Sequence, residues 1–183
     1  MEGMDYCRAL FSVASAVNSS LDNSAVLEAV VRNAANAMNA KGSTLMLLSA
    51  DHRRLQQVAS YGLSERYMKK GPLDADLSIP EALQGRAVAV PDVASDYRVQ
   101  YRSEAVEEGI ASMLSVPMRL HSKVIGVIRV YTSDPRDFTA HDIEFAEAIA
   151  GLGAIAIENA RQYGEAKTHL SSLEAYVYRY AGT

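Results

Sequence analysis

The chain of 183 residues has a single cysteine, Cys7, and no tryptophan. One cysteine excludes an internal disulfide and a zinc site built from several cysteines, and it suits a reducing compartment. The N-terminus, residues 1–5, is acidic where a signal peptide would be basic, and no apolar run approaches the ~18–20 residues that cross a bilayer. We therefore expect a cytoplasmic protein without a membrane-spanning segment.

Basic residues are too scattered to form a nucleic-acid-binding face. Lys and Arg number 18 against 22 Asp and Glu, which gives a formal net charge of −4. Because neutralising phosphates requires a gathered basic surface, the composition argues against a nucleic-acid partner. With 49% hydrophobic residues, 11 Gly and 5 Pro, the chain is instead expected to bury a core and to form one domain with a short surplus.

Both ends of the chain carry helical periodicity. Apolar residues recur at a spacing of 3.6 residues within 10–17 and again within 26–38. We expect Asn23 or Ser24 to cap the second of these helices and Gly42 to mark its end, since glycine adopts a left-handed conformation at little steric cost.

A third helix is expected to begin after Thr139, with Asp142 three residues on as in a capping box, and to continue to about Lys167. At ~1.5 Å per residue it would be about 40 Å long, so part of it is expected to project from the domain. Its middle, 146–160, is rich in Ala and Gly, which would let another backbone approach closely.

Strand-like segments fill the middle of the chain, and the second of two expected hairpins is apolar on both faces, which places it at the centre of a sheet. A symmetric turn centred on residues 121–122 would oppose Ser112 to Tyr131. Leu114 would then oppose Arg129. Ser112, Arg129 and Tyr131 would thereby share one face. The expected elements are strands at 44–48, 55–61, 87–90, 111–118 and 124–131, a short helix near Ser78 and Pro80, and a helical stretch at 103–108.

The order of these elements, and four strings within them, resemble the GAF domain, a small-molecule-sensing module of signalling proteins. The strings are VPDV at 90–93, SMLSVPM at 112–118, VIGVI at 124–128, and FTAHD at 138–142 leading into AIENAR at 156–161. The resemblance covers about residues 8–165. Residues 1–183 would then form one domain, with 166–183 as a C-terminal helical tail.

The resemblance implies an α+β fold, related to PAS and profilin-like folds, with a central antiparallel sheet of five or six strands. N- and C-terminal helices would cover one face, and short helices and loops would roof a ligand pocket on the other. It also implies homodimers through the terminal helices, here near residues 5–18 and 140–170.

Known ligand classes of the family find little support in this sequence. Ser133 and Asp134 stand where cyclic-nucleotide-binding members carry an Asn-Lys pair. Cys7 lies too early in the chain to reach a bilin, and one cysteine cannot complete the thiol cycle of members that reduce free methionine sulfoxide. Haem-binding members need an axial histidine near the pocket, and the four histidines fall in turns, a helix start and the tail: His52, His121, His141 and His169. We therefore assign no cofactor and no metal.

Arg129 interrupts an otherwise apolar strand face, so its guanidinium must be paired or solvated. One interpretation is that it lines the pocket and binds a carboxylate or phosphate through two parallel hydrogen bonds. The alternatives are an internal ion pair with an acid such as Asp92, Asp96 or Glu104, and an open end of the sheet where solvent reaches the guanidinium. The sequence leaves these interpretations open.

Five further residues are candidate ligand contacts. Tyr131 and Ser112 are the expected neighbours of Arg129 on its strand face. Tyr97, Arg98 and Tyr101 belong to a loop that combines aromatic rings with arginine, which suits a roof over a planar or anionic ligand, although a surface loop anchored by its tyrosines is an alternative.

No catalytic triad, metal-ligand spacing or phosphate-binding glycine loop occurs, so we expect a non-enzymatic role. Our prediction is a stand-alone sensor or regulatory domain that binds an unidentified small molecule and signals through its terminal helices to a partner protein. A ligand-free dimerisation or scaffold module is the alternative. A redox enzyme using Cys7 is a third possibility.

Overall fold

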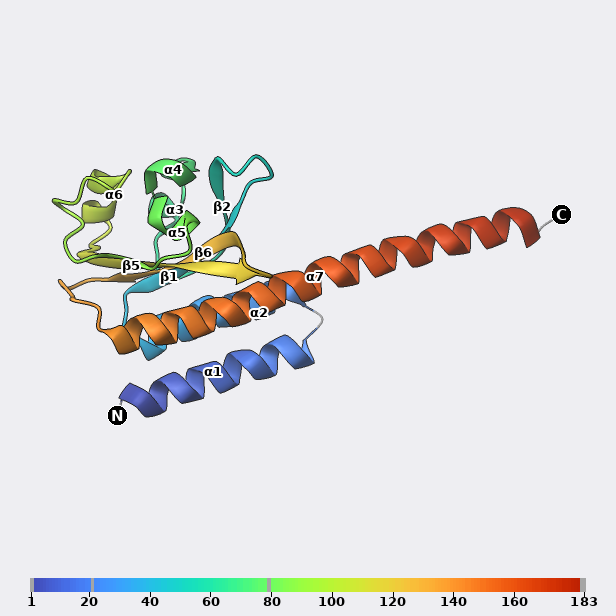
Figure 1. The fold of residues 1–183 in the computed structure, drawn as a ribbon, viewed down its shortest axis with the longest axis horizontal. Coiled ribbons are helices and arrows are strands. Elements are labelled where there is room, and N and C mark those ends of the chain that lie inside the picture. Colours follow the sequence, from blue (N-terminus) through green and yellow to red (C-terminus); the bar gives the residue numbers. More distant parts are fainter. Residues whose placement is uncertain (1, 21, 79, 182–183) are drawn as a thin grey trace.

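A six-stranded antiparallel sheet lies at the centre of the structure, a computed structural model that describes residues 2–20, 22–78 and 80–181 (Figure 1). The strand order is β3-β2-β1-β6-β5-β4, so the hairpin of β5 and β6 is central, as its two apolar faces predict. The expected α+β architecture is confirmed. The strands are β1 (Gly42–Leu48), β2 (Arg54–Tyr61), β3 (Leu73–Asp74), β4 (Val88–Val90), β5 (Ser112–Leu120) and β6 (Lys123–Thr132).

Helices cover the two faces of the sheet unequally. The long helices α1 (Glu2–Ser19), α2 (Asn23–Ala37) and α7 (Ala140–Ala181) lie on one face. The other face carries four short helices, α3 (Glu65–Met68), α4 (Ala75–Ser78), α5 (Pro80–Leu83) and α6 (Arg102–Glu107) (Figure 1). The sequence predicts one short helix near Ser78 and Pro80, where the structure has α4 and α5, and it predicts neither α3 nor β3.

The apolar core on the long-helix side joins α1 and α2 to α7 across the central strands. Val13 of α1, Val30 of α2 and Ile149 of α7 are all fully buried there, against residues such as Leu114 and Ile128 of the sheet. At Gly153 of α7 an added Cβ would lie 3.4 Å from Leu45 and Met118. The small residues of α7 therefore bring this helix close to the sheet, as predicted.

The expected caps of α2 are wrong by one residue at its start and by several at its end. Asp22, not Asn23 or Ser24, is the N-cap, and its carboxylate accepts hydrogen bonds from the backbone N–H groups of the next turn. The left-handed residue after the helix is Asn39, with φ 48°. Gly42 instead starts β1, where any Cβ would lie 2.4 Å from the carbonyl oxygen of Tyr61.

The hairpin of β5 and β6 has a different register from the predicted one. Its turn residues 121 and 122 both have positive φ, and an irregularity between Met118 and Arg119 shifts the pairing by one residue. Ser115, not Leu114, therefore opposes Arg129, and Ser112 opposes Thr132. Because neighbouring positions on a strand point to opposite faces, the shift moves Ser112 to the long-helix side.

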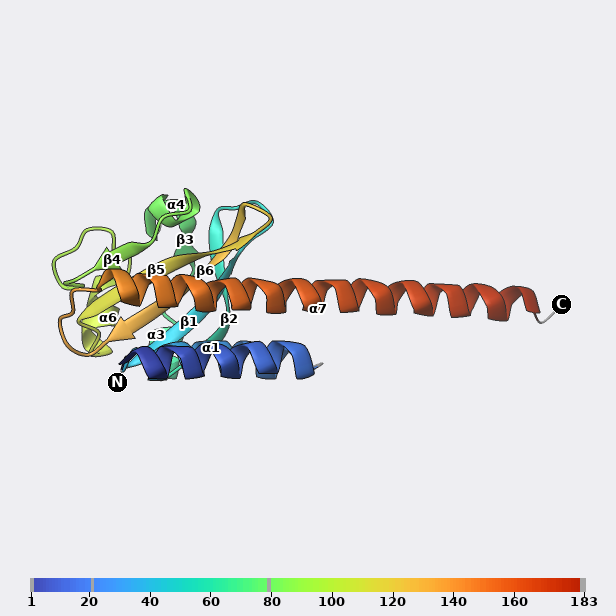
Figure 2. The same cartoon turned by 60° about the horizontal axis from the view of Figure 1, so that its bottom comes forward.

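Helix α7 begins as predicted and ends later. Thr139 Oγ1 accepts from Asp142 N (3.2 Å), while Asp142 Oδ2 accepts from Thr139 N (2.8 Å), so the capping box is confirmed. The helix then runs for 42 residues, about 63 Å, and its second half extends far beyond the sheet (Figure 2). The expected tail from residue 166 continues the same helix to Ala181, while residues 182–183 lie outside the described part.

Helices α1 and α7 run side by side in the same direction in both views (Figures 1 and 2). None of the helices in the described part of the chain is long and apolar enough to span a membrane.

Candidate functional site

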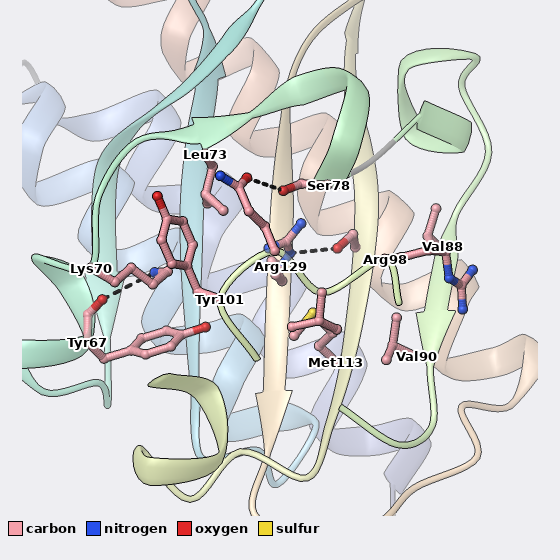
Figure 3. Close-up of a pocket in the computed structure, with 13 residues that line it drawn as sticks. Tyr67, Lys70, Leu73, Ser78, Val88, Val90, Arg98, Tyr101, Met113 and Arg129 are labelled. Atoms are coloured by element: carbon pink, nitrogen blue, oxygen red, sulfur yellow. Dashed lines mark hydrogen bonds between the residues drawn. The ribbon is translucent and has the colours of Figure 1, made fainter. Parts of the chain in front are cut away.

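A small cavity lies between the short-helix face of the sheet and the segments that roof it (Figure 3). Its volume is about 10 Å³, room for roughly one water molecule. Side chains therefore fill most of the space where the fold leaves a pocket. The lining residues are Tyr67, Lys70, Leu73, Ser78, Val88, Val90, Arg98, Val99, Gln100, Tyr101, Met113, Ser115 and Arg129.

Arg129 lies on the floor of this cavity, 5% exposed. Its Nε donates a hydrogen bond to Ser115 Oγ (2.7 Å), from the residue that opposes it on β5. No carboxylate of the described residues lies within 4.0 Å of the guanidinium. The internal ion pair considered from the sequence is therefore not formed, because Asp92 and Asp96 bond within their own loop instead.

Lys70 places a second cation beside Arg129, from the segment after α3. Its Nζ donates to the carbonyl oxygen of Tyr67 (3.2 Å) and lies 3.7 Å from the centre of that residue's ring. Burial, and then the positive charge of Arg129, lower the pKa of Lys70 to about 8, although Glu104 and Glu108 act in the opposite direction. At pH 7 the amine is still about nine-tenths protonated.

Hydrogen bonds from two residues join the roof segments, which also pack buried apolar side chains such as Leu73 and Ala75. The side-chain oxygen of Gln100 accepts from Asp74 N (2.9 Å) and from Ser78 Oγ (3.1 Å), and its amide nitrogen donates to Pro72 O (3.3 Å). Tyr101 OH donates to the same carbonyl at 3.0 Å. We call Gln100 and Tyr101, with their partners in 72–78, the roof latch. Because its acceptors and donors are polar, water can replace each bond when the roof opens.

The loop expected to roof the pocket contributes only some of its predicted residues. Arg98 and Tyr101 line the cavity, whereas Tyr97 is 87% exposed and points away from it. The charge of Arg98 is already matched, because Asp96 accepts hydrogen bonds from its guanidinium and Glu81 lies 3.8 Å away. The Tyr97 side chain therefore faces solvent in the closed state and does not line the cavity.

Tyr131 and Ser112 are also placed differently from the prediction. Tyr131 is on the correct face but lies beneath Tyr67, 1% exposed, with its hydroxyl 3.1 Å from Thr44 Oγ1. It supports the cavity from below and does not line it. Ser112 lies on the opposite face, because of the register shift, and has no access to the cavity.

Five of the remaining lining residues were missed, for two reasons. Ser115 and Met113 would have followed from the correct register of the β5–β6 hairpin. Tyr67, Lys70 and Gln100 lie in irregular segments without periodicity, so no sequence pattern indicates where their side chains point.

Groups associated with other chemistries lie away from the cavity. Cys7 is exposed on α1, on the long-helix side. His52 and His121 lie in hairpin turns and His141 in the first turn of α7, while the side chain of His169 lies outside the described set. Among the described residues, no group of three or more His, Cys, Asp and Glu is arranged to hold a metal ion.

A buried polar junction connects α1 to the start of α7. Tyr6 OH donates to Asp142 Oδ1 (2.5 Å), and Arg136 Nη2 donates to the same oxygen (2.7 Å). Burial raises the pKa of Asp142, but the hydrogen bonds from Tyr6 and Thr139 and the charge of Arg136 outweigh it and hold the pKa below its ordinary value. Burial and the bond to Asp142 raise the pKa of Tyr6 to about 12.

The same junction reaches the edge of the cavity. Ser112 Oγ accepts from the backbone N–H of Arg136 (2.8 Å) and donates to the carbonyl oxygen of Pro91 (2.5 Å). Pro91 directly follows Val90, a lining residue. We call the series Pro91, Ser112, Arg136, Asp142 and Tyr6 the polar relay. The sequence predicts Ser112 as a ligand contact. In the structure its hydroxyl instead forms part of the polar relay.

A curled antiparallel sheet with long helices on one face and a roofed cavity on the other is the architecture of GAF domains, which occur in sensor and signalling proteins. The chain belongs to the GAF family, because the family's sequence model, "GAF domain", matches residues 20–158.

Solved GAF domains share this fold at low sequence identity. The GAF domain of a phosphoenolpyruvate-protein phosphotransferase from Coxiella burnetii is similar over 88% of this chain and 98% of its own, with a TM-score of 0.77 and 20% identity. Its counterpart from Acinetobacter is similar over 85% of this chain and 94% of its own, with a TM-score of 0.70 and 23% identity. Free methionine-R-sulfoxide reductase from Neisseria meningitidis is similar over 86% of this chain and 91% of its own, with a TM-score of 0.71 and 18% identity. The fold therefore occurs both in domains of larger proteins and in an enzyme.

Proposed function

We propose that this GAF domain is a non-catalytic sensor that binds a small molecule between the sheet and its roof, and signals through the terminal helices of a homodimer to a partner protein. The observation that carries the proposal is Arg129, a buried guanidinium on the floor of the cavity that has no carboxylate partner among the described residues. A buried charge of this kind is costly unless something compensates it, and a ligand would do so.

The structure, with its roof closed over a small cavity, corresponds to the state of the protein without ligand. Because the cavity has room for only about one water molecule, a ligand must displace the segments at 72–78 and 98–101. The roof latch suits this role, since its hydrogen bonds exchange with water at a net cost of about 0.5–1.5 kcal/mol each. A ligand selects the open state by its higher affinity for it.

The polar relay would supply a route from the cavity to the terminal helices. A movement of the lining residue Val90, at the end of edge strand β4, would displace Pro91, whose carbonyl oxygen accepts a hydrogen bond from Ser112. Ser112 Oγ also accepts a hydrogen bond from the backbone N–H of Arg136, and the guanidinium of Arg136 donates to Asp142. A change at this point alters how α1 lies against α7, because Tyr6 joins the two helices.

Exposed apolar side chains on the terminal helices support a homodimer. Met4 and Phe11 of α1 are 67% and 76% exposed, and Ile155 and Tyr163 of α7 are about half exposed. Large apolar groups that remain in solvent along two neighbouring helices are typical of an association surface. A second copy that packs against α1 and α7 would cover them.

The ligand-free scaffold keeps one observation in its favour, the small size of the cavity. The two functions differ in their response to ligands, which a thermal-shift screen against small metabolites and nucleotides measures. A true ligand at a hundredfold excess over its dissociation constant should stabilise the protein by about 2.7 kcal/mol.

The same screen needs a variant with a blocked cavity. Val90→Phe fills the cavity and should abolish the response, whereas Val58→Phe, at a strand position that is 42% exposed, should leave it intact. If the screen yields no stabilising compound and sedimentation equilibrium shows a dimer, the scaffold replaces the sensor as the function.

A further inference from the structure

We propose that the ligand of this cavity carries a carboxylate, which binds between the guanidinium of Arg129 and the amine of Lys70, and that the rest of the ligand is short and apolar. The inference rests on the proposed function and names the chemical class that the cavity selects.

The charges on the cavity wall do not balance. Among the described residues that line the cavity, three are cations and none is Asp or Glu. Arg98 is matched by Asp96 and Glu81 behind it. Arg129 and Lys70 form no ion pair with any described residue. The described lining of the cavity therefore carries an excess of positive charge.

The hydrogen-bonding groups of Arg129 are mostly unused. A guanidinium has five N–H donors in a planar fork, and the only bond that Arg129 makes to a described residue is from Nε to Ser115. The two terminal nitrogens remain available. Two parallel N–H donors match the two oxygens of a carboxylate, which makes this pairing stronger and more directional than a single contact.

Lys70 is placed to complete the pairing from the side. In Figure 3, Lys70 and Arg98 lie on opposite sides of Arg129, with Tyr67 beneath Lys70. Lys70 rests on the Tyr67 ring and donates one hydrogen bond to a carbonyl oxygen, which leaves donors of its ammonium group for a ligand. Two cations and one anionic group would leave the site with less excess charge than it has when empty.

The remaining walls set the size and polarity of the ligand. Apolar side chains of Leu73, Val88, Val90 and Met113 surround the space beyond the two cations. A phosphate would present several charged oxygens to these walls, whereas a carboxylate on a short aliphatic chain presents one polar end and one apolar end.

Binding of an anion should also depend on pH through Lys70. The groups around this amine are Arg129 of β6, Tyr67 of α3, Tyr101 of the roof, Glu104 of α6, and Glu108 directly after α6. Because burial and Arg129 lower the pKa of Lys70 to about 8, the amine loses its charge in mildly alkaline solution. Affinity for a carboxylate should then fall by up to about tenfold per pH unit above 8.

The test uses acetate and butyrate as probes, butyramide as the uncharged analogue, and inorganic phosphate as the competing anion. Calorimetric titration of the full chain should detect butyrate more strongly than acetate, and neither butyramide nor phosphate at comparable concentration. Arg129→Met should weaken butyrate binding by about 10- to 100-fold, the range expected for loss of a charged hydrogen-bonding group.

Matched variants separate a role in binding from a role in folding. Lys70→Met should weaken binding and remove its pH dependence, while Lys69→Met, which removes the exposed neighbouring amine, should change neither. Arg129→Lys keeps the charge without the planar fork and should bind with intermediate affinity. Circular dichroism on each variant checks that it is folded.

The outcomes distinguish this inference from the proposed function. Binding of butyramide that survives Arg129→Met, or phosphate binding tighter than butyrate, overturns the carboxylate assignment and leaves the cavity as a binding site. If none of these probes and no compound of the metabolite screen binds, both the assignment and the sensor are overturned.

Discussion

Replacing Arg129 with methionine should make the unliganded protein more stable. The wild-type residue places a guanidinium in a site that is 5% exposed, with one neutral acceptor and no carboxylate among the described residues. Methionine retains much of the aliphatic stem and fills similar space without a charge. Removal of an unpaired buried charge should therefore relieve a penalty that the fold carries until a ligand binds.

The magnitude follows from two opposing terms. The lost hydrogen bond between Arg129 Nε and Ser115 Oγ, at 2.7 Å, involves a charged donor and contributes about 1.5–3 kcal/mol. The relieved desolvation penalty is several kcal/mol for an ion without a partner, and Lys70 no longer experiences a neighbouring positive charge. The net gain should be about 1–2 kcal/mol, or a rise in Tm of about 2–8 °C for a chain of this length.

Differential scanning calorimetry in a dilute buffer free of carboxylates measures this change. Arg98→Met is the matched control, because it removes an arginine from the same cavity that does have partners. Asp96 and Glu81 would then lose their cation, so this variant should unfold at a lower temperature than the wild type. An Arg129→Met protein that unfolds several degrees below the wild type would refute the reasoning, since it would mean that Arg129 stabilises the closed state.

Three further predictions concern the junction and the roof latch. Tyr6→Phe removes one of the hydrogen bonds to Asp142 and should lower the free energy of unfolding by about 1–2 kcal/mol in urea titrations, whereas Tyr97→Phe, at an exposed hydroxyl, should have no effect. Because the folded-state pKa of Asp142 is held below its ordinary value, its contribution to stability is present above about pH 4 and should disappear as the pH falls through the lowered value, which acid titrations of wild type and Asp142→Asn can compare. Gly71→Ala forces a Cβ within 2.6 Å of the Tyr101 hydroxyl at a φ of +122°, so hydrogen exchange should show the roof opening more often, and an unchanged exchange rate there would contradict the role of the latch.

The order and type of the main elements could be predicted because the core imposes periodicity on the sequence. The second hairpin is apolar on both faces, which is enough to place it at the centre of the sheet between β1 and β4. The capping box of Thr139 and Asp142 is encoded within four residues, so it too follows from local sequence. These features depend on short-range patterns.

The site could be predicted only in part, since it depends on register and on irregular backbone. Arg129 stands out in the sequence as a charge among apolar residues, and in the structure it lies on the floor of the cavity. The irregularity between Met118 and Arg119 has no clear sequence signal, and it exchanges the faces of Ser112 and Ser115. Lys70 reaches the cavity from a loop, where only the tertiary structure decides which way a side chain points.

The small cavity and the unpaired cations point to one description of the resting state when they are considered together. A pocket that served only to complete the core would be filled by apolar side chains. Arg129 and Lys70 instead place a buried and a half-buried charge there, and each charge lowers the stability of the closed state. The closed roof rests on replaceable hydrogen bonds of Gln100 and Tyr101. A charge that awaits a partner favours a ligand of opposite charge, whose binding free energy would open the roof and compensate the cations in the same step.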